Sequence, residues 1–476
     1  MGNSPHTPSI HILDDDSLLH IFYLYRPAVF DGDESRILHA AGGRGWNRER
    51  WWYQLAHICQ RWRNLILRSA SYLDLCLVCT FGTPITDMLA HSPPLPLIIY
   101  YHHENRKIAP EDEGEIIFAL EQRERVRRIR LCLPILNLQR FTAAIEGEYP
   151  ILEYMIMSTA NEVKNVDLML NETLQAPNLR HLTLEGFSIP IRSHLLTSAI
   201  GLVALSLAMK HPSSYFHPGT LLRWISLMPQ LETLLVAFGF LVLNRDVERQ
   251  LMRTPITTHV TLPNLLMLGS RVSSAYIEAV VRHITAPRLE NLLIAFPNQL
   301  TFFIPCLLQF MNTTENLTFS RATFMFFNER VDVKVYPHMT KPYSLSIVVN
   351  CWHLDWQVSS VAQIFNALSQ NFSAVEHLTI EHEVHSQSSE EHNEVDHAEW
   401  RKLLASFSNV KILNIPDGLV GELSRCLRLD DGEPPLELLP ELQELIFSES
   451  SAVGDAFTQF IDSRKNTGRP VTLTRG

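Results

Sequence analysis

Residues 177–184 read Pro-Asn-Leu-Arg-His-Leu-Thr-Leu, and the spacing apolar-x-x-apolar-x-apolar within this segment recurs along most of the chain. The last two apolar positions are two residues apart, so both point to one face of a short strand, while the first anchors the turn before it. One such strand buries little alone, but stacked neighbours bury a continuous core. The copies are Val126-Ile129-Leu131, Leu152-Met155-Met157, Leu179-Leu182-Leu184, Leu202-Leu205-Leu207, Leu231-Leu234-Val236, Leu265-Leu268, Leu289-Leu292-Ile294, Val375-Leu378-Ile380, Val410-Leu413-Ile415 and Leu442-Leu445-Phe447.

The period of this pattern predicts the fold class. Copies from Val126 to Leu289 begin 23 to 34 residues apart, which is typical of leucine-rich repeats with one strand per repeat. Segments between copies, such as 219–227 and 274–283, are long enough for helices. We therefore expect an α/β protein in which a small helical module precedes an irregular leucine-rich-repeat solenoid with a curved parallel sheet; an ordinary α/β domain is the alternative. The residues expected to point inward are Leu182, Leu184, Leu205, Leu207, Leu234 and Leu378.

The repeats are irregular in two respects. Most copies lack the asparagine or cysteine that usually follows the strand, and the period blurs between residues 289 and 375. There we expect strands at 302–327, 331–336 and 343–349, with a hairpin among them. The last unit is predicted to have a strand at 442–447, a helix at 453–464 and a strand at 471–473, which together would cap the solenoid.

Before the repeats, residues 12–73 have the pattern of two short amphipathic helices. The first begins with acidic residues and Ser17, which suit a helix start, and is expected to end before Pro27. The apolar stripe of the first helix comprises Leu18, Ile21, Phe22 and Tyr25, and that of the second comprises Trp51, Leu55, Ile58, Trp62 and Leu65.

This module resembles the F-box motif of mushroom proteins. The likeness lies in the order Ile12-Leu13, an acidic helix start, Leu18-Leu19, Ile21-Phe22 and then residues 57–65, His-Ile-Cys-Gln-Arg-Trp-Arg-Asn-Leu. Leu13 is followed by Asp14 where such motifs usually carry proline. The resemblance implies docking onto the Skp adaptor of a Skp/cullin/F-box ubiquitin ligase, and through it to cullin, while the repeat surface holds a substrate protein. The adaptor-binding residues it implies are Ile12, Leu13, Leu18, Leu19, Ile21, Phe22, Ile58 and Trp62.

The chain of 476 residues is too long for a single core. The expected domains are an F-box-like module at 10–75, a linker with the first strands at 76–120, and the repeat domain at 121–476. The two helices could instead form the first layer of one larger core.

Charge and composition argue against nucleic-acid or membrane partners. The net charge is −11, and nucleic-acid binding needs clustered Lys and Arg. The basic run at 123–130 is interleaved with apolar residues, which favours a helix end leading into a strand with solvated arginines. The longest apolar run, 233–243, is too short to span a bilayer. Seven scattered cysteines suit reduced thiols, so we expect a soluble cytoplasmic or nuclear protein.

No catalytic motif, cofactor fingerprint or metal motif is found, so neither catalytic residues nor cofactors are expected. Cys76 and Cys79 have the spacing of a redox motif, but they lie in an apolar run and are interpreted as buried structural thiols. The histidines and acids of 381–399 are interpreted as a solvated loop, not a metal site. Residues 384–397 are accordingly predicted to be dispensable for folding. Two classes of function remain. The first is an F-box subunit that links a substrate protein to a ligase. The second is a repeat scaffold outside a ligase, or an unrecognised α/β enzyme.

Overall fold

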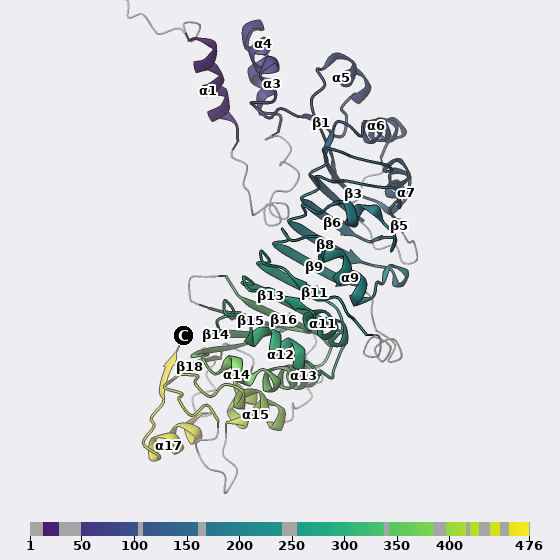
Figure 1. Ribbon diagram of the computed structural model, residues 1–476. Helices are drawn as coiled ribbons and strands as arrows, with labels where there is room; N and C mark the ends of the chain where they lie inside the picture. The colour runs from purple at the N-terminus through teal and green to yellow at the C-terminus, as the bar shows by residue number, and fades with distance from the viewer. Residues whose placement is uncertain are drawn as a thin grey trace, which may run out of the picture. The chain divides into compact units, whose positions relative to one another are not determined.

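The computed structural model (Figure 1) describes residues 13–27, 49–102, 108–159, 168–239, 255–337, 342–383, 397–415, 419–427, 438–447 and 457–475. Contacts within the chain divide it into two units, residues 1–200 and 201–476. This division falls inside the predicted repeat domain, and the boundaries expected at 75 and 120 stay predictions.

The described residues of the first unit form seven α-helices and a parallel sheet in the order β1-β2-β3-β4-β6. In Figure 1, α5, α6 and α7 follow one side of these strands. The elements are α1 (Asp15–Tyr25), α3 (Trp51–Ala56), α4 (Gln60–Arg68), β1 (Leu77–Cys79), α5 (Ile85–His91), β2 (Leu97–His102), α6 (Pro110–Glu121), β3 (Val126–Leu133), α7 (Ile135–Ala144), β4 (Tyr154–Thr159), β5 (Leu168–Met169), β6 (His181–Glu185), β7 (Phe187–Ser188) and α8 (His194–Ser198).

The second unit carries a sheet in the order β8-β9-β11-β13-β16-β15-β14-β17-β18-β19-β20. Its elements are β8 (Ala204–Met209), α9 (Pro218–Ile225), β9 (Thr233–Phe238), β10 (Val260–Thr261), β11 (Met267–Arg271), α11 (Ser274–Val281), β12 (Ile284–Thr285), β13 (Asn291–Pro297), α12 (Pro305–Asn312), β14 (Arg321–Phe326), β15 (Arg330–Tyr336), β16 (Leu345–Asn350), α13 (Leu354–Ala367), α14 (Ser369–Phe372), β17 (His377–His382), α15 (His397–Ala405), β18 (Ile412–Ile415), α16 (Val420–Cys426), β19 (Glu444–Phe447), α17 (Thr458–Asn466) and β20 (Thr472–Arg475), together with a short 3-10 helix, η3 (Pro212–Ser214).

The recurring motif sets the strand register in both units. In the first unit Met155 pairs with Leu182, and in the second Leu205 pairs with Leu234, which pairs with Leu268. Equivalent motif positions thus lie side by side and share one buried row. The six residues predicted to point inward are at most 1% exposed, so the parallel sheet and its core face are confirmed.

The sheet contains antiparallel pairs between residues 289 and 375, where the spacing of the motif is irregular. Strand β15 is antiparallel to both β14 and β16, while β14 and β16 remain parallel to β17 and β13. The hairpin prediction is confirmed, but the strand expected from residue 302 is wrong, because α12 occupies Pro305–Asn312. Proline suits the first helical turn, and the buried carboxylate of Glu278 accepts hydrogen bonds from the N–H groups of Cys306 and Leu307, both at 2.8 Å.

Asparagines link neighbouring repeats at a position other than the expected one. The side chains of Asn178, Asn264 and Asn409 each precede the first apolar residue of a motif copy. They donate to the carbonyl oxygens of Pro150, Pro229 and Ser373 at 2.7, 3.3 and 2.6 Å. Each acceptor lies two residues before the motif of the preceding copy, so these amides connect successive turns.

Candidate partner-binding site

The helical module, residues 13–27 and 49–73, has a core formed between α1 and α4. Leu18 and Phe22 of α1 are buried with Trp62 and Ile66 of α4. The rings of Phe22 and Trp62 meet edge to face, with centroids 4.8 Å apart. Asp14 caps α1 by accepting a hydrogen bond from the Ser17 N–H at 2.7 Å, and the helix ends before Pro27, so both predicted ends of α1 are confirmed.

The predicted single stripe from Trp51 to Leu65 is wrong. Helix α3 ends at Ala56 and α4 begins at Gln60. The Sγ atom of Cys59 accepts a hydrogen bond from the Trp62 N–H at 3.5 Å and caps the new helix. This break leaves Ile58 in an exposed turn and places the two tryptophans of the stripe on different helices.

Three further apolar side chains on α1 remain substantially exposed, although the ring centroid of Tyr25 is 6.4 Å from that of the buried Trp51. Ile21 is 41% exposed, Leu24 68% and Tyr25 56%. Their spacing of three and four residues places them together on one side of the helix. We call these three residues the outer apolar face; Ile58, in the turn between α3 and α4, is exposed as well.

The structure separates the residues predicted to bind an adaptor into two groups. Leu18, Phe22 and Trp62 belong to the core of the module, whereas Ile21 and Ile58 are exposed. Leu13 and Leu19 are half-buried, and Ile12 lies outside the described residues. Leu24 and Tyr72 were not among the predicted residues but are also exposed; the step of three residues from Ile21 could have indicated Leu24.

The module is fastened to the first strands by an ionic network. Asp74, at φ 53° between α4 and β1, pairs with Arg26 at 2.6 Å and also with Arg127 of β3. Arg127 pairs in turn with Glu153 at 2.9 Å. Burial alone would raise the pKa of Asp74, but the hydrogen bond and charge of Arg127, with the charge of Arg26, hold that pKa below its ordinary value.

An indole hydrogen bond adds to this attachment. The Trp52 Nε1 group donates to the carbonyl oxygen of Cys76 at 3.2 Å. Arg128 of β3 pairs with Glu49 at 2.9 Å. The basic run does lead from the end of α6 into β3, but Arg127 and Arg128 are largely buried ion-pair partners and not the solvated arginines expected from the sequence.

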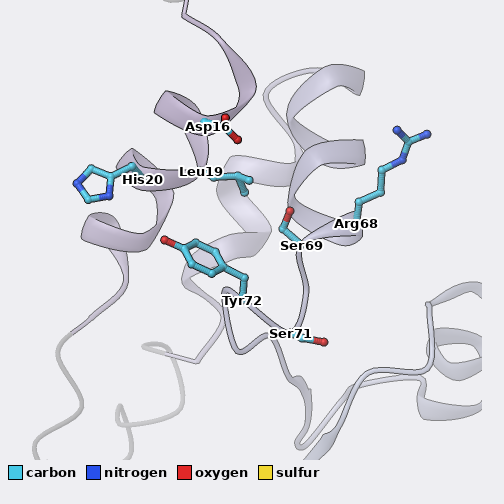
Figure 2. Close-up of a pocket in the computed structure, with 7 residues that line it drawn as sticks. All are labelled: Asp16, Leu19, His20, Arg68, Ser69, Ser71 and Tyr72. Atoms are coloured by element: carbon cyan, nitrogen blue, oxygen red, sulfur yellow. The ribbon is translucent and has the colours of Figure 1, made fainter.

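An open pocket lies where the end of α4 approaches α1 (Figure 2). Its volume is about 590 Å³. Leu19 lies between the two helices, and Tyr72, whose ring centroid is 5.5 Å from that of Tyr23, forms one wall. The mixed lining could accept an amphipathic side chain of a partner. The residues lining it are Asp16, Leu19, His20, Arg68, Ser69, Ser71 and Tyr72.

The thiols singled out in the sequence are structural. Burial raises the pKa of Cys76 to about 11 and that of Cys79 to about 12. Both groups stay protonated near neutral pH and so lack the thiolate that redox chemistry requires. The interpretation of Cys76 and Cys79 as buried structural thiols is confirmed.

No cluster of histidines, cysteines and acids that could hold a metal ion occurs in the part of the chain that the structure describes. The histidine-rich and acid-rich stretch 381–399 lies mostly outside those residues, including nearly all of the loop predicted to be dispensable. Within the described ranges, no helix is both long and apolar enough to cross a bilayer.

Comparisons with known proteins leave the family open. No family model matches this chain, and no curated protein does. Among solved structures it is similar to the crystal structure of the TLR13–ssRNA13 complex, with 13% identity and a TM-score of 0.31 over 80% of this chain and 48% of that one. The chain thus spans about half the length of that structure. Its assignment as a mixed α/β protein with a large, mostly parallel sheet rests on its own strands and helices.

Proposed function

We propose that this protein is the substrate-recognition subunit of a Skp/cullin/F-box ubiquitin ligase. In this proposal the helical module docks onto the Skp adaptor, and the repeat sheet holds a substrate protein. The observation that supports it is the division of α1: Leu18 and Phe22 fill the core, while Ile21, Leu24 and Tyr25 are 41–68% exposed. Apolar side chains gathered on an exposed helix face are typical of a protein interface.

The attachment of the module supports this role. A recognition subunit must hold its substrate at a defined distance from the ligase, so its docking module has to be fixed to the substrate-binding part. The pairs of Asp74 with Arg26 and Arg127, and the bond from Trp52 to Cys76, link the module to β1 and β3. The module is therefore suited to transmit a fixed orientation to the first repeats.

The test is the affinity of the full chain for a purified Skp adaptor, measured by isothermal titration calorimetry. The double variant Ile21→Ser, Leu24→Ser removes two exposed apolar side chains and leaves Phe22 and Trp62 in place. If each contributes about 2 kcal/mol as an interface anchor, the double variant should lose about 4 kcal/mol and adaptor binding should weaken by several hundredfold.

A matched control comes from the same unit. Ile191 is 69% exposed but lies outside the module, so Ile191→Ser should bind the adaptor as the wild type does. A wild-type chain that does not bind the adaptor, or a folded double variant that binds equally well, would contradict the proposal. Either result would favour a repeat scaffold outside a ligase.

A further inference from the structure

Four large apolar side chains are exposed at one edge of the second unit. Leu300 and Phe303 follow β13 and are 41% and 71% exposed; Trp352 and Trp356 follow β16 and are 65% and 47% exposed. We call these four residues the tryptophan edge. Tryptophan is among the residues that most often dominate binding energy in protein interfaces.

The two segments that carry these side chains lie side by side. Pro297, the last residue of β13, is in register with Asn350, the last residue of β16, so both segments leave the sheet at neighbouring points. The Gln363 amide of α13 donates to the Leu300 carbonyl at 3.2 Å. Gln363 lies two helical turns after Trp356, on the same face of α13. The hydrogen bond from Gln363 therefore places the backbone of Leu300 next to the helix face that carries Trp356.

Buried hydrogen bonds hold this edge in position. The Gln357 side chain is 1% exposed, and its amide donates to the carbonyl oxygens of Phe327 and Cys351 at 2.8 and 2.9 Å. The ring of His353 meets that of Trp356 edge to face at 4.5 Å. The edge is therefore ordered before any partner arrives, which lowers the entropic cost of binding.

The charge around the edge is one-sided. No Lys or Arg occurs between Arg288 and Arg321, or between Lys341 and Arg401, the stretches that supply all four side chains. Glu329 is exposed, and its carbonyl accepts from the Cys351 N–H at 3.0 Å, which places it beside Trp352. The neighbouring Arg330 is 49% exposed, lies 4.8 Å from the centroid of the Phe327 ring and is ion-paired with Asp332 at 3.1 Å. With this pair neutral, Glu329 is the acid that contributes net charge beside Trp352.

We propose that the tryptophan edge binds a protein segment in which Arg or Lys stands among apolar residues. The cation would stack on an indole ring beside the Glu329 carboxylate, and the flanking apolar residues would cover Leu300 and Phe303. The acidic surroundings disfavour an anionic membrane surface, which attracts basic side chains. This surface is separate from the outer apolar face, and the inference does not depend on the adaptor proposal.

The test uses random short peptides displayed on phage, selected on the full chain and counter-selected on the variant Trp352→Ala, Trp356→Ala. Enriched peptides should combine Arg or Lys with apolar residues. In synthetic form they should bind the wild type at least about tenfold more tightly than the variant. Glu329→Gln and added salt should each weaken binding. Because Trp352 is largely exposed, the single variant Trp352→Ala provides the same comparison if the double variant unfolds.

Leu227→Ala is the matched control, since Leu227 is 41% exposed in the same unit and its variant should bind the peptides like the wild type. Enrichment of peptides without a cation, or equal binding by the folded tryptophan variant, would overturn the proposal. Two other results would also overturn it. They are cosedimentation of the wild type with phosphatidylcholine/phosphatidylserine vesicles and self-association of the wild type in sedimentation velocity, in either case lost in the tryptophan variant. These results would assign the edge to a membrane or to a second copy.

Discussion

The carboxylate of Asp74 lies 2.6 Å from the guanidinium of Arg26, which joins the end of α1 to the segment between α4 and β1. The same carboxylate also pairs with Arg127 of β3. The Asp74 side chain therefore binds both the end of α1 and strand β3. Its loss should destabilise the packing of the module against the first strands more than it destabilises the repeats.

Asp74→Asn tests this connection, because asparagine tolerates the left-handed backbone at this position but removes the charge. We expect a loss of about 1–2 kcal/mol of stability near pH 7, since the pair is partly exposed. The folded pKa of Asp74 lies below 3.8, so the ion pairs stabilise the fold above that pH and are lost as the pH falls through the folded pKa. Urea denaturation of the wild type and the variant from pH 7 toward the folded pKa should show the difference between their unfolding free energies shrinking as the pH falls. A difference that does not change with pH would contradict this account.

The core and outer residues of α1 should respond differently to truncation. Phe22→Ala and Trp62→Ala each remove a ring from a buried contact, so we expect about 3–5 kcal/mol of destabilisation. Leu24→Ala should change stability by less than about 0.5 kcal/mol. Thermal unfolding followed by circular dichroism checks both; a stable Phe22→Ala protein would place that side chain outside the core.

Arg464 should be essential to the last repeat. Its side chain is fully buried and donates to the carbonyl oxygens of Leu439, Pro440 and Leu442 at 3.0–3.2 Å. Arg464→Met leaves these carbonyls without their donor, so we expect a loss of about 3 kcal/mol or more. Hydrogen exchange of β19 should accelerate while that of β9 stays unchanged. Acceleration throughout the unit would show that the last repeat does not unfold separately.

Glu278 should stabilise the start of α12. Its carboxylate accepts from two backbone N–H groups of the next repeat, and Glu278→Gln turns one acceptor into a donor that faces an N–H. We expect about 1–3 kcal/mol of destabilisation and faster exchange of the Cys306 and Leu307 amides. Unchanged exchange would mean that the helix does not need this cap.

The repeat strands could be predicted from the sequence because their signal is local. A period of two within each strand and a motif that recurs every few tens of residues suffice to place Leu182 or Leu378 in the core. The order of β14, β15 and β16 could not be derived, since it depends on pairing between distant segments. Helix α12 was missed because two of its apolar residues, Leu308 and Phe310, are two positions apart, a spacing that also suits a strand.

The helical module was harder to predict, because an apolar stripe does not reveal which of its members face a core. Phe22 and Ile21 are adjacent and both apolar, yet only Phe22 meets Trp62. The break between α3 and α4 depends on a thiol cap at Cys59, a weak signal in sequence. The attachment through Asp74 joins residues far apart in the chain and has no local signature.

The central claim is that the outer apolar face of the helical module receives an adaptor protein. Hydroxyl-radical footprinting tests this claim directly, because it labels exposed side chains in the intact protein and labels less those that a bound partner covers. On saturation with the Skp adaptor, labelling of Leu24 and Tyr25 should fall several-fold, while that of the equally exposed Leu136 should not change. Unaltered labelling of α1 at saturating adaptor would contradict the account.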